Sequence, residues 1–213
     1  MNVIVMRHGD ATFLGAQRVL TERGRQEVQI TALKLAGAMK ITKIMSSPKQ
    51  RALQTASIVQ SLLRGAKIPQ IEVLPELSPT GDAEMVYEYL NASCAPDDTV
   101  LLVSHIPQVC NLSCTLCHRE LDIPRFHTAS ALILQRPAAN SLAPDMSATA
   151  PYGYFQAVKF FTPSSELNLV QPMINPHQAA VSAAMASSLV GTAAAQPHFA
   201  TNLAGQAGLS LSL

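Results

Sequence analysis

The first apolar run of the chain ends abruptly in two basic residues and a glycine. Residues 2–6, Asn-Val-Ile-Val-Met, carry no charge and are rich in β-branched side chains, a pattern that predicts a strand buried on both faces. Arg7 and His8 follow at once, and such groups would be costly inside a core. At the carboxyl end of a parallel strand they would lie where open α/β sheets bind their ligands. The run therefore predicts a candidate nucleophile in His8, a candidate phosphate clamp in Arg7, and a close approach of the backbone to phosphate at Gly9.

Strand and helix patterns alternate along the chain after this run. Further strands are expected over 41–45, 71–74, 99–103, 130–135 and 155–161. Helices are expected after the N-caps Thr21, Ser47 and Asp82, with Pro48 at the first helical position, and a fourth helix runs to about His118. Residues 11–19, 75–79 and 137–153 are expected to be loops. The alternation predicts an α/β fold, a three-layer sandwich in which a mainly parallel sheet is flanked by helices.

Charge is distributed unevenly along the 213 residues. Every Lys and Arg lies at or before Lys159, the last acidic residue is Glu166, and the remainder is rich in Ala, Ser, Gln and Leu. We therefore expect one folded domain over residues 1–163 and a poorly ordered, uncharged tail over 164–213. A weakly amphipathic helix over 179–189, formed with a partner, is the alternative for part of this tail.

Composition excludes several classes of protein. The 15 basic and 14 acidic residues are nearly balanced, which gives no reason to expect a nucleic-acid partner. We expect no secretory signal, because the first strand starts at residue 2. The longest weakly apolar stretch, 179–195, is interrupted by hydroxyl side chains, so no membrane span is expected. Four cysteines in a chain of this length do not make a disulfide scaffold. We expect a cytoplasmic monomer.

Basic residues also follow the second and fourth predicted strands. Arg51 falls in the first turn of the helix after Ser47, and His105 comes directly after the strand over 99–103. Because carboxyl ends of parallel strands meet at one edge, two guanidiniums and two imidazoles would share one crevice with Arg7 and His8. An anion would relieve their repulsion, and guanidinium forks suit phosphate oxygens. No acidic cluster stands beside them, so neither a metal nor another cofactor is expected.

Several short motifs follow one another in a fixed order. They are Arg7–Asp10, Leu20–Gly24, Ser47–Thr55, Leu74–Leu77, Ser104–Pro107 and Phe126–Ala131, the last with His127 where Thr is usual. As an ordered set they resemble the histidine phosphatase (phosphoglycerate mutase-like) superfamily, and within it the small phosphohistidine phosphatases of the SixA type. The resemblance covers about residues 1 to 162 and implies a phosphoglycerate mutase-like fold without the large helical lid insertion of the sugar-phosphate mutases.

The resemblance also implies roles for individual residues. His8 would carry a phosphohistidine intermediate, while Arg7, Arg51 and His105 would bind the phosphoryl group and stabilise its equatorial oxygens, as in-line phosphoryl transfer requires. Glu76 matches the position of the general acid in larger members of the family. A solvated or capping loop glutamate is the alternative for Glu76.

These inferences predict a phosphatase that dephosphorylates a histidine-phosphorylated signalling protein, such as a histidine-phosphotransfer domain. A phosphatase of small phosphate esters is the first alternative, and the absence of a lid argues against it, because a small ester gains from enclosure. A non-catalytic phosphate or phosphoprotein binder is the second, and such a binder would have no need of the candidate nucleophile His8.

Three cysteines, Cys110, Cys114 and Cys117, have the C-x3-C-x2-C spacing that holds the cluster in radical S-adenosylmethionine enzymes. Here the spacing falls within a predicted helix rather than a loop. At i, i+4 and i+7 the three thiols would share one helical face, which suits small buried hydrophobic residues. We therefore expect no metal cluster at this motif.

Overall fold

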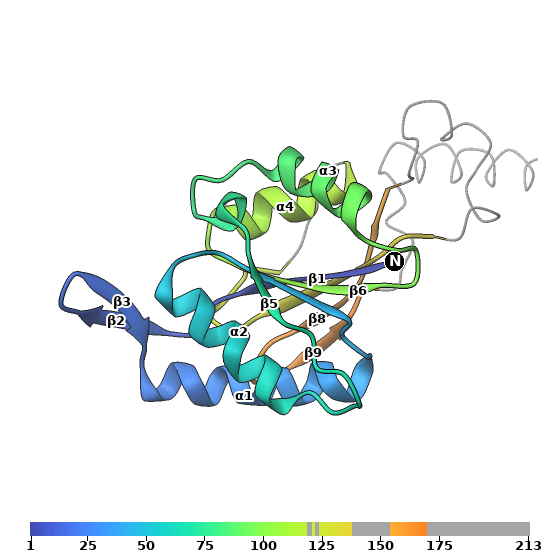
Figure 1. The fold of residues 1–213 in the computed structure, drawn as a ribbon. Coiled ribbons are helices and arrows are strands. Elements are labelled where there is room, and N and C mark those ends of the chain that lie inside the picture. The colour runs from blue at the N-terminus through green and yellow to red at the C-terminus, as the bar shows by residue number, and fades with distance from the viewer. Residues whose placement is uncertain (119–120, 122–123, 138–153, 170–213) are drawn as a thin grey trace, which may run out of the picture. The chain divides into compact units, whose positions relative to one another are not determined.

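The computed structural model describes residues 1–118, 121, 124–137 and 154–169 (Figure 1). The expectations for 138–153 and for the tail beyond residue 169 fall outside the described residues. The elements are β1 (Asn2–Arg7), β2 (Ala11–Leu14), β3 (Gln17–Leu20), α1 (Glu22–Ala38), β4 (Lys43–Ser46), α2 (Gln50–Leu62), β5 (Ile71–Val73), the 3₁₀ helix η1 (Pro75–Leu77), α3 (Ala83–Ser93), β6 (Thr99–Ser104), α4 (Gln108–Cys117), β7 (Ala131–Gln135), β8 (Gln156–Phe161) and β9 (Glu166–Asn168). None of the helices in this described part is long and apolar enough to cross a membrane.

The described residues form a seven-stranded sheet in the order β5-β4-β6-β1-β7-β8-β9. β5, β4, β6 and β1 pair in parallel, whereas β7, β8 and β9 join by antiparallel pairing. Alternation of direction across the last three strands makes β8 run with β1, so β7 and β9 run against the other five. The expectation of a mainly parallel sheet is therefore confirmed.

Helices cover both faces of this sheet, with α3 and α4 on one side and α1 and α2 on the other (Figure 1). The side chains of β1 illustrate that both faces of the sheet are buried. Val3 and Val5 pack into the core with α3 and α4, and Ile4 and Met6 pack into the core with α1 and α2. All four side chains are fully buried, as the uninterrupted apolar run predicts for a central strand. The three-layer sandwich is confirmed.

Side-chain caps explain where two of the helices begin. The Thr21 hydroxyl accepts a hydrogen bond from the Gly24 N–H at 2.9 Å, and the Asp82 carboxylate accepts from the N–H groups that open α3. Both N-caps were predicted correctly. The prediction of Ser47 as a third cap is wrong, because α2 begins at Gln50 after Lys49, and the Ser47 hydroxyl instead lies 2.8 Å from the Nε2 atom of His105.

Three segments expected to be irregular have regular structure. Residues 11–20 form the β2–β3 hairpin, which turns at Gly15 with φ +60°, a conformation that glycine adopts without steric cost. Residues 75–77 form η1. β9 pairs with β8 beyond the domain boundary predicted at residue 163, and the compact unit that contains the sheet runs over Met1–Val170.

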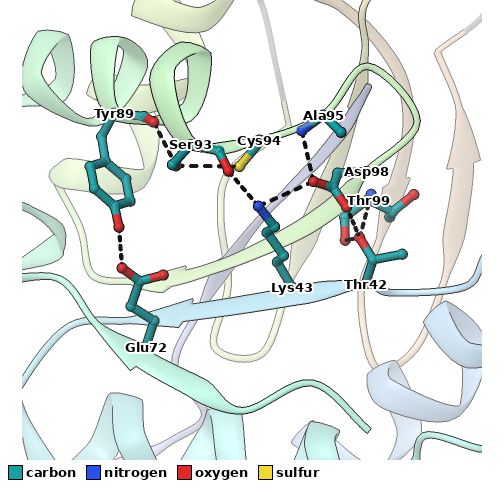
Figure 2. Close-up of polar contacts among 9 residues, drawn as sticks. All are labelled: Thr42, Lys43, Glu72, Tyr89, Ser93, Cys94, Ala95, Asp98 and Thr99. Atoms are coloured by element: carbon teal, nitrogen blue, oxygen red, sulfur yellow. Dashed lines mark hydrogen bonds and ion pairs between the residues drawn. The ribbon is translucent and has the colours of Figure 1, made fainter. Parts of the chain in front are cut away.

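Polar side chains tie together the amino ends of β4 and β6 (Figure 2). The Asp98 carboxylate accepts hydrogen bonds from the Ala95 N–H and the Thr42 hydroxyl, each at 2.8 Å, and pairs with the Lys43 ammonium at 3.2 Å. The Lys43 ammonium also donates to the carbonyl of Ser93 at the end of α3. This cluster, which we call the amino-edge network, joins the sheet to α3 through groups that satisfy one another.

Candidate active site

The four basic residues predicted from the strand ends lie at one edge of the sheet. Arg7 ends β1 with His8 directly after it, His105 follows β6, and Arg51 is in the first turn of α2. The Arg51 Nε atom is 3.0 Å from His8 Nε2, and the rings of His8 and His105 lie 5.0 Å apart between centroids. Parallel pairing of β1, β4 and β6 thus brings together residues that are far apart in the sequence.

Two hydrogen bonds fix the orientation and tautomer of the His8 ring. Its Nδ1 atom lies 2.7 Å from the carbonyl oxygen of Gly9, which can only accept, so Nδ1 carries the proton. The Nε2 atom then holds the lone pair, and it accepts the hydrogen bond from the Arg51 guanidinium. The lone pair of the imidazole therefore faces the Arg51 guanidinium.

The surroundings keep His8 neutral. Burial lowers its pKa from 6.5 to about 4, against the raising effect of the hydrogen bond to Gly9, and the charges of Arg51, Arg7 and Arg18 lower it further. Because only a neutral imidazole has a lone pair for attack, nearly all of the His8 side chains are competent at neutral pH. The ring is 5 % exposed.

His105 is also held neutral. Burial lowers its pKa to about 3, followed by the charges of Arg51, His8 and Lys49. Its Nε2 atom lies 2.8 Å from the Ser47 hydroxyl, whereas its Nδ1 atom is buried with no hydrogen-bond partner among the described residues. A bound anion would favour the protonated form, and His105 would then donate to that anion.

The two guanidiniums of the site lack carboxylate partners. No ion pair joins Arg7 or Arg51 to an acidic side chain of the described residues. Arg7 donates from Nη1 to the carbonyl of Phe126 at 2.9 Å, and its buried Nε has no partner in this part of the chain. Burial lowers the pKa of both arginines, although a guanidinium stays charged at any physiological pH. Unpaired, partly desolvated cations of this kind favour an anionic ligand.

Gly9 lies just after β1, where the chain passes so close to α1 that only glycine fits. A Cβ atom there would lie 2.6 Å from the Gly24 carbonyl oxygen and 2.7 Å from Val28 Cγ2. The Gly9 N–H donates to the Thr55 hydroxyl at 3.2 Å, and that hydroxyl donates to the Arg51 carbonyl. The predicted contact of Gly9 with phosphate is untested by this geometry, and the contacts it does make hold the His8 ring and the start of α2 in place.

Glu76 lies on η1, which is tied to the same edge of the sheet. The Ser104 hydroxyl donates to the Leu77 carbonyl at 2.6 Å, and the Gln108 side chain donates to the Glu76 carbonyl at 2.9 Å. The Glu76 Oε2 atom is buried and has no hydrogen-bond partner among the described residues, and no hydrogen bond links it to His8. Its role as an acid remains a prediction.

Three further polar residues at this edge were not predicted. Ser47 contacts His105 directly, Lys49 contributes to the electrostatics of His105, and Arg18 of β3 adds a third guanidinium near the site. The sequence signal for Arg18 is Gly15-Ala16 between two short runs, which permits a two-residue hairpin turn. Ser47 had a local explanation as a helix cap, and only the long-range pairing of β4 with β6 shows its other contact.

The candidate cluster-binding cysteines all lie on α4. Cys117 is buried and Cys110 packs against the core beneath α3 and α4, and burial raises the pKa of the Cys110 thiol. Within residues 1–118, 121, 124–137 and 154–169, no three His, Cys, Asp or Glu side chains are grouped so as to hold a metal ion.

The geometry fits a phosphoryl-transfer site that uses histidine as its nucleophile. A neutral imidazole with an oriented lone pair lies beside unpaired guanidiniums and a second imidazole, at the carboxyl edge of an α/β sheet. Phosphoryl transfer needs mainly positioning and positive charge, and this edge provides both.

Comparison with known proteins identifies the family. The model of the histidine phosphatase superfamily (branch 1) matches residues 3–91. Phosphohistidine phosphatase SixA of Escherichia coli strain K12 is 39 % identical over 138 residues, which span 62 % of this chain and 83 % of that protein. The chain belongs to the histidine phosphatase superfamily, as its motifs predicted, and it is a phosphatase of that superfamily.

Solved structures agree with this assignment. The structure of the protein histidine phosphatase SixA complexed with tungstate has a TM-score of 0.62 and 32 % identity, covering 77 % of this chain and 98 % of that one. A phosphoserine phosphatase from Entamoeba histolytica in complex with 3-phosphoglyceric acid has a TM-score of 0.54 and 14 % identity, covering 76 % and 96 %. The second likeness shows the fold alone, and one fold hosts many substrates.

Proposed function

We propose that this chain is a phosphohistidine phosphatase that removes the phosphoryl group from a histidine-phosphorylated protein through a phosphohistidine intermediate on His8. The observation that carries the proposal is the His8 ring, with Nδ1–H held by the Gly9 carbonyl and the Nε2 lone pair turned toward the Arg51 guanidinium. The identity shared with phosphohistidine phosphatase SixA supports the substrate class.

In the first step, His8 Nε2 attacks phosphorus in line with the leaving nitrogen. The new Nε2–P bond forms as the substrate P–N bond breaks, and the substrate imidazole leaves with a proton taken from water or already on its ring. Arg7 and Arg51 neutralise the equatorial oxygens, and His105 donates to them once the anion favours its protonation. The step exchanges one phosphoramidate for another.

In the second step, water hydrolyses the intermediate. The oxygen of water forms a bond to phosphorus, the His8 Nε2–P bond breaks, and inorganic phosphate leaves. Throughout, Nδ1–H of His8 donates to the Gly9 carbonyl, which stabilises the positive charge that phosphorylation places on the ring. The residues thus return to their starting protonation states.

A protein substrate suits this site better than a small ester. The described residues include no large helical insertion of the kind that encloses substrates in the sugar-phosphate mutases, which favours a phosphoryl group borne on another protein. A phosphoramidate leaves readily once its imidazole is protonated, whereas an alkoxide needs a placed acid, an effect worth about 10²–10⁴-fold. Glu76 is the one acid predicted here, and it has no hydrogen bond to the nucleophile.

The intermediate is testable by trapping. The full chain is mixed briefly with a ³²P-labelled phosphohistidine domain and quenched at alkaline pH, and acid-labile label is expected on the enzyme. His8→Ala is expected to abolish both the label and turnover. His118→Asn is the matched control, because it removes an imidazole that stacks on Tyr154. Asparagine tolerates the left-handed backbone conformation of residue 118. Label on the His8→Ala protein would contradict the assignment.

Substrate class is testable by comparing kcat/KM on a phosphohistidine domain with kcat/KM on a sugar phosphate. We expect a large preference for phosphohistidine. Glu76→Gln should reduce ester hydrolysis far more than phosphohistidine hydrolysis, since only the ester depends on a placed acid. Equal or better activity of the wild type on the sugar phosphate would favour the small-ester alternative.

A further inference from the structure

The β2–β3 hairpin projects from the sheet close to the carboxyl end of β1 (Figure 1). It carries two large apolar side chains that are exposed to solvent. Phe13 is 73 % exposed and Leu14 is 69 % exposed, more than any other large apolar side chain among the described residues. Scattered single apolar residues are ordinary on a surface, but two adjacent ones at the tip of a projecting hairpin are unusual. These two side chains also contribute to no hydrophobic core, because a two-stranded ribbon has none of its own.

The register of the hairpin separates these two side chains. Phe13 lies directly opposite Arg18, so the two share one face of the ribbon, and the Arg18 guanidinium carbon is 5.6 Å from the centre of the Phe13 ring. Leu20, two residues from Arg18, lies on the same face and is buried in the core. Leu14 alternates with Phe13 and lies on the opposite face.

The face that bears Phe13 is continuous with the catalytic edge. The Leu20 N–H donates to the Gln54 side chain at 2.7 Å, which fixes the base of the hairpin to α2, the helix that carries Arg51. The guanidinium of Arg18 donates to the Ala11 carbonyl at 2.8 Å, while its buried Nε has no partner among the described residues. After burial, the charge of Arg18 is the next cause of the lowered pKa of Arg51. Arg18 is therefore near both the Phe13 ring and the Arg51 guanidinium.

A second apolar side chain and an excess of positive charge indicate what this surface contacts. Ile106 follows His105 directly and is 43 % exposed, so an apolar group adjoins the pocket there too. Arg7, Arg18 and Arg51 form no ion pair with a carboxylate of the described residues. The complementary partner has a phosphoryl group flanked by apolar and acidic side chains. On a helix, residues three or four positions from the phosphohistidine lie beside it, as this pattern requires.

We propose that Phe13 and Arg18 form a docking wall for a helix of the substrate protein. Phe13 packs on an apolar side chain about one turn from the phosphohistidine, and Arg18 pairs with an adjacent carboxylate. The inference rests on the proposed function and extends it, because it assigns recognition of the protein to a surface outside the phosphate pocket. Leu14, on the opposite face of the hairpin, takes no part.

The test compares kcat/KM of the full chain on a phosphorylated four-helix histidine-phosphotransfer domain and on free phosphohistidine. Phe13→Ser is expected to lower kcat/KM on the domain at least about tenfold, mainly through KM, as loss of an aromatic anchor does. On free phosphohistidine it should stay within about twofold. Leu14→Ser, a matched loss of exposed apolar area, should leave both values within about twofold. Arg18→Gln should cost more on the domain than on free phosphohistidine.

Four results would overturn the docking wall. The first two are equal losses of kcat/KM on the domain for Phe13→Ser and Leu14→Ser, and no loss of kcat/KM on the domain for Phe13→Ser. The third is an equal loss of kcat/KM on both substrates for Arg18→Gln. The fourth is a wild type that hydrolyses free phosphohistidine but not the domain. The last would leave the phosphohistidine chemistry intact. A wild type inactive on every phosphohistidine substrate would instead remove the proposed function, and the docking wall with it.

Discussion

At the amino ends of the strands, the Lys43 ammonium and the Asp98 carboxylate pair at 3.2 Å, whereas at the carboxyl ends Arg7 and Arg51 have no carboxylate partner among the described residues. In the amino-edge network every charged group has hydrogen bonds (Figure 2). The carboxyl edge instead has buried nitrogens of Arg7 and His105 that no described group satisfies.

The difference separates a structural use of polar groups from a functional one. Paired groups contribute modestly to stability and need nothing further. Unpaired, partly buried cations are costly in the free protein, and a bound anion offsets that cost, so the same charges that weaken the fold strengthen phosphate binding. We therefore expect substitutions at the carboxyl edge to reduce activity, and substitutions at the amino edge to reduce stability.

After the loss of the nucleophile in His8→Ala, Arg51→Ala should have the largest effect on activity. In the proposed mechanism it removes one charged donor from the phosphoryl oxygens, for which we expect a loss of about 10²–10³-fold in kcat/KM on phosphohistidine and on p-nitrophenyl phosphate alike. The melting temperature should change little, because Arg51 forms no ion pair with a described acidic residue, and loss of its hydrogen bond to His8 is offset by loss of a charge that opposes protonation of His8. Arg23→Ala, which removes a guanidinium with an 80 % exposed side chain, is the control. A lower melting temperature of Arg51→Ala without a loss of activity would contradict the functional role that we assign to the carboxyl edge.

As the pH falls, the groups of the carboxyl edge should be the first to lower the free energy of unfolding. His8 has a pKa of about 4 when folded and 6.5 as its ordinary value, so between these values the unfolded chain binds a proton that the folded chain does not. Stability is then fully present above pH 6.5 and declines as pH falls toward 4, by at most about 3 kcal/mol for this group. His105 acts in the same direction. Asp98, whose pKa is lowered, keeps its contribution until pH falls below its ordinary value of 3.8.

The measurement is the free energy of unfolding by urea at pH 7 and pH 4.5. His8→Ala should flatten the decline, while His118→Asn should leave it unchanged. Added inorganic phosphate should restore part of the lost stability by favouring the protonated imidazoles. A decline that is identical in the wild type and in His8→Ala would show that the imidazole of His8 is not its source.

Asp98→Ala should reduce stability without reducing activity. It removes the acceptor for Ala95 N–H, the Thr42 hydroxyl and the Lys43 ammonium, which we expect to cost about 1–2 kcal/mol. In a chain of this size that lowers the melting temperature by about 2–8 °C. Asp97→Ala, at the exposed neighbouring carboxylate, is the control. A tenfold fall in kcat for Asp98→Ala would show that the two edges are coupled.

The carboxyl edge was more predictable from sequence than its surroundings. Arg7, His8 and His105 lie at or directly after the ends of buried strands. Strand ends in a parallel sheet converge, so their meeting follows from a local pattern and one topological rule. The caps Thr21 and Asp82 are equally local. By contrast, the strands of the β2–β3 hairpin have four residues each, with β2 largely exposed and β3 half-buried, and neither has the apolar run or the clean alternation that marks a strand.

Other features depend on contacts between distant residues. Ser47 has the sequence of a helix cap, yet the pairing of β4 with β6 brings its hydroxyl to His105, 58 residues away, and α2 starts later. The tautomer of His8 depends on the Gly9 carbonyl pointing toward the His8 ring, and residue types alone do not predict this backbone geometry. β9 lies in a nearly uncharged stretch and is a strand because β8 offers it an unpaired edge.

Removing residues 171–213 should have the smallest effect, because every contact described at either edge comes from the unit Met1–Val170. On p-nitrophenyl phosphate we expect kcat within about threefold of the full chain, a change in barrier under about 1 kcal/mol. A second truncation after residue 163 is the sharper comparison. It removes β9, the Lys159–Glu166 pair at 3.0 Å and the Ser165 carbonyl that accepts from Lys34. It should therefore lower the melting temperature while the first truncation does not. A tenfold or greater loss of kcat in the first truncation, with the melting temperature retained, would show that residues beyond 170 take part in the site.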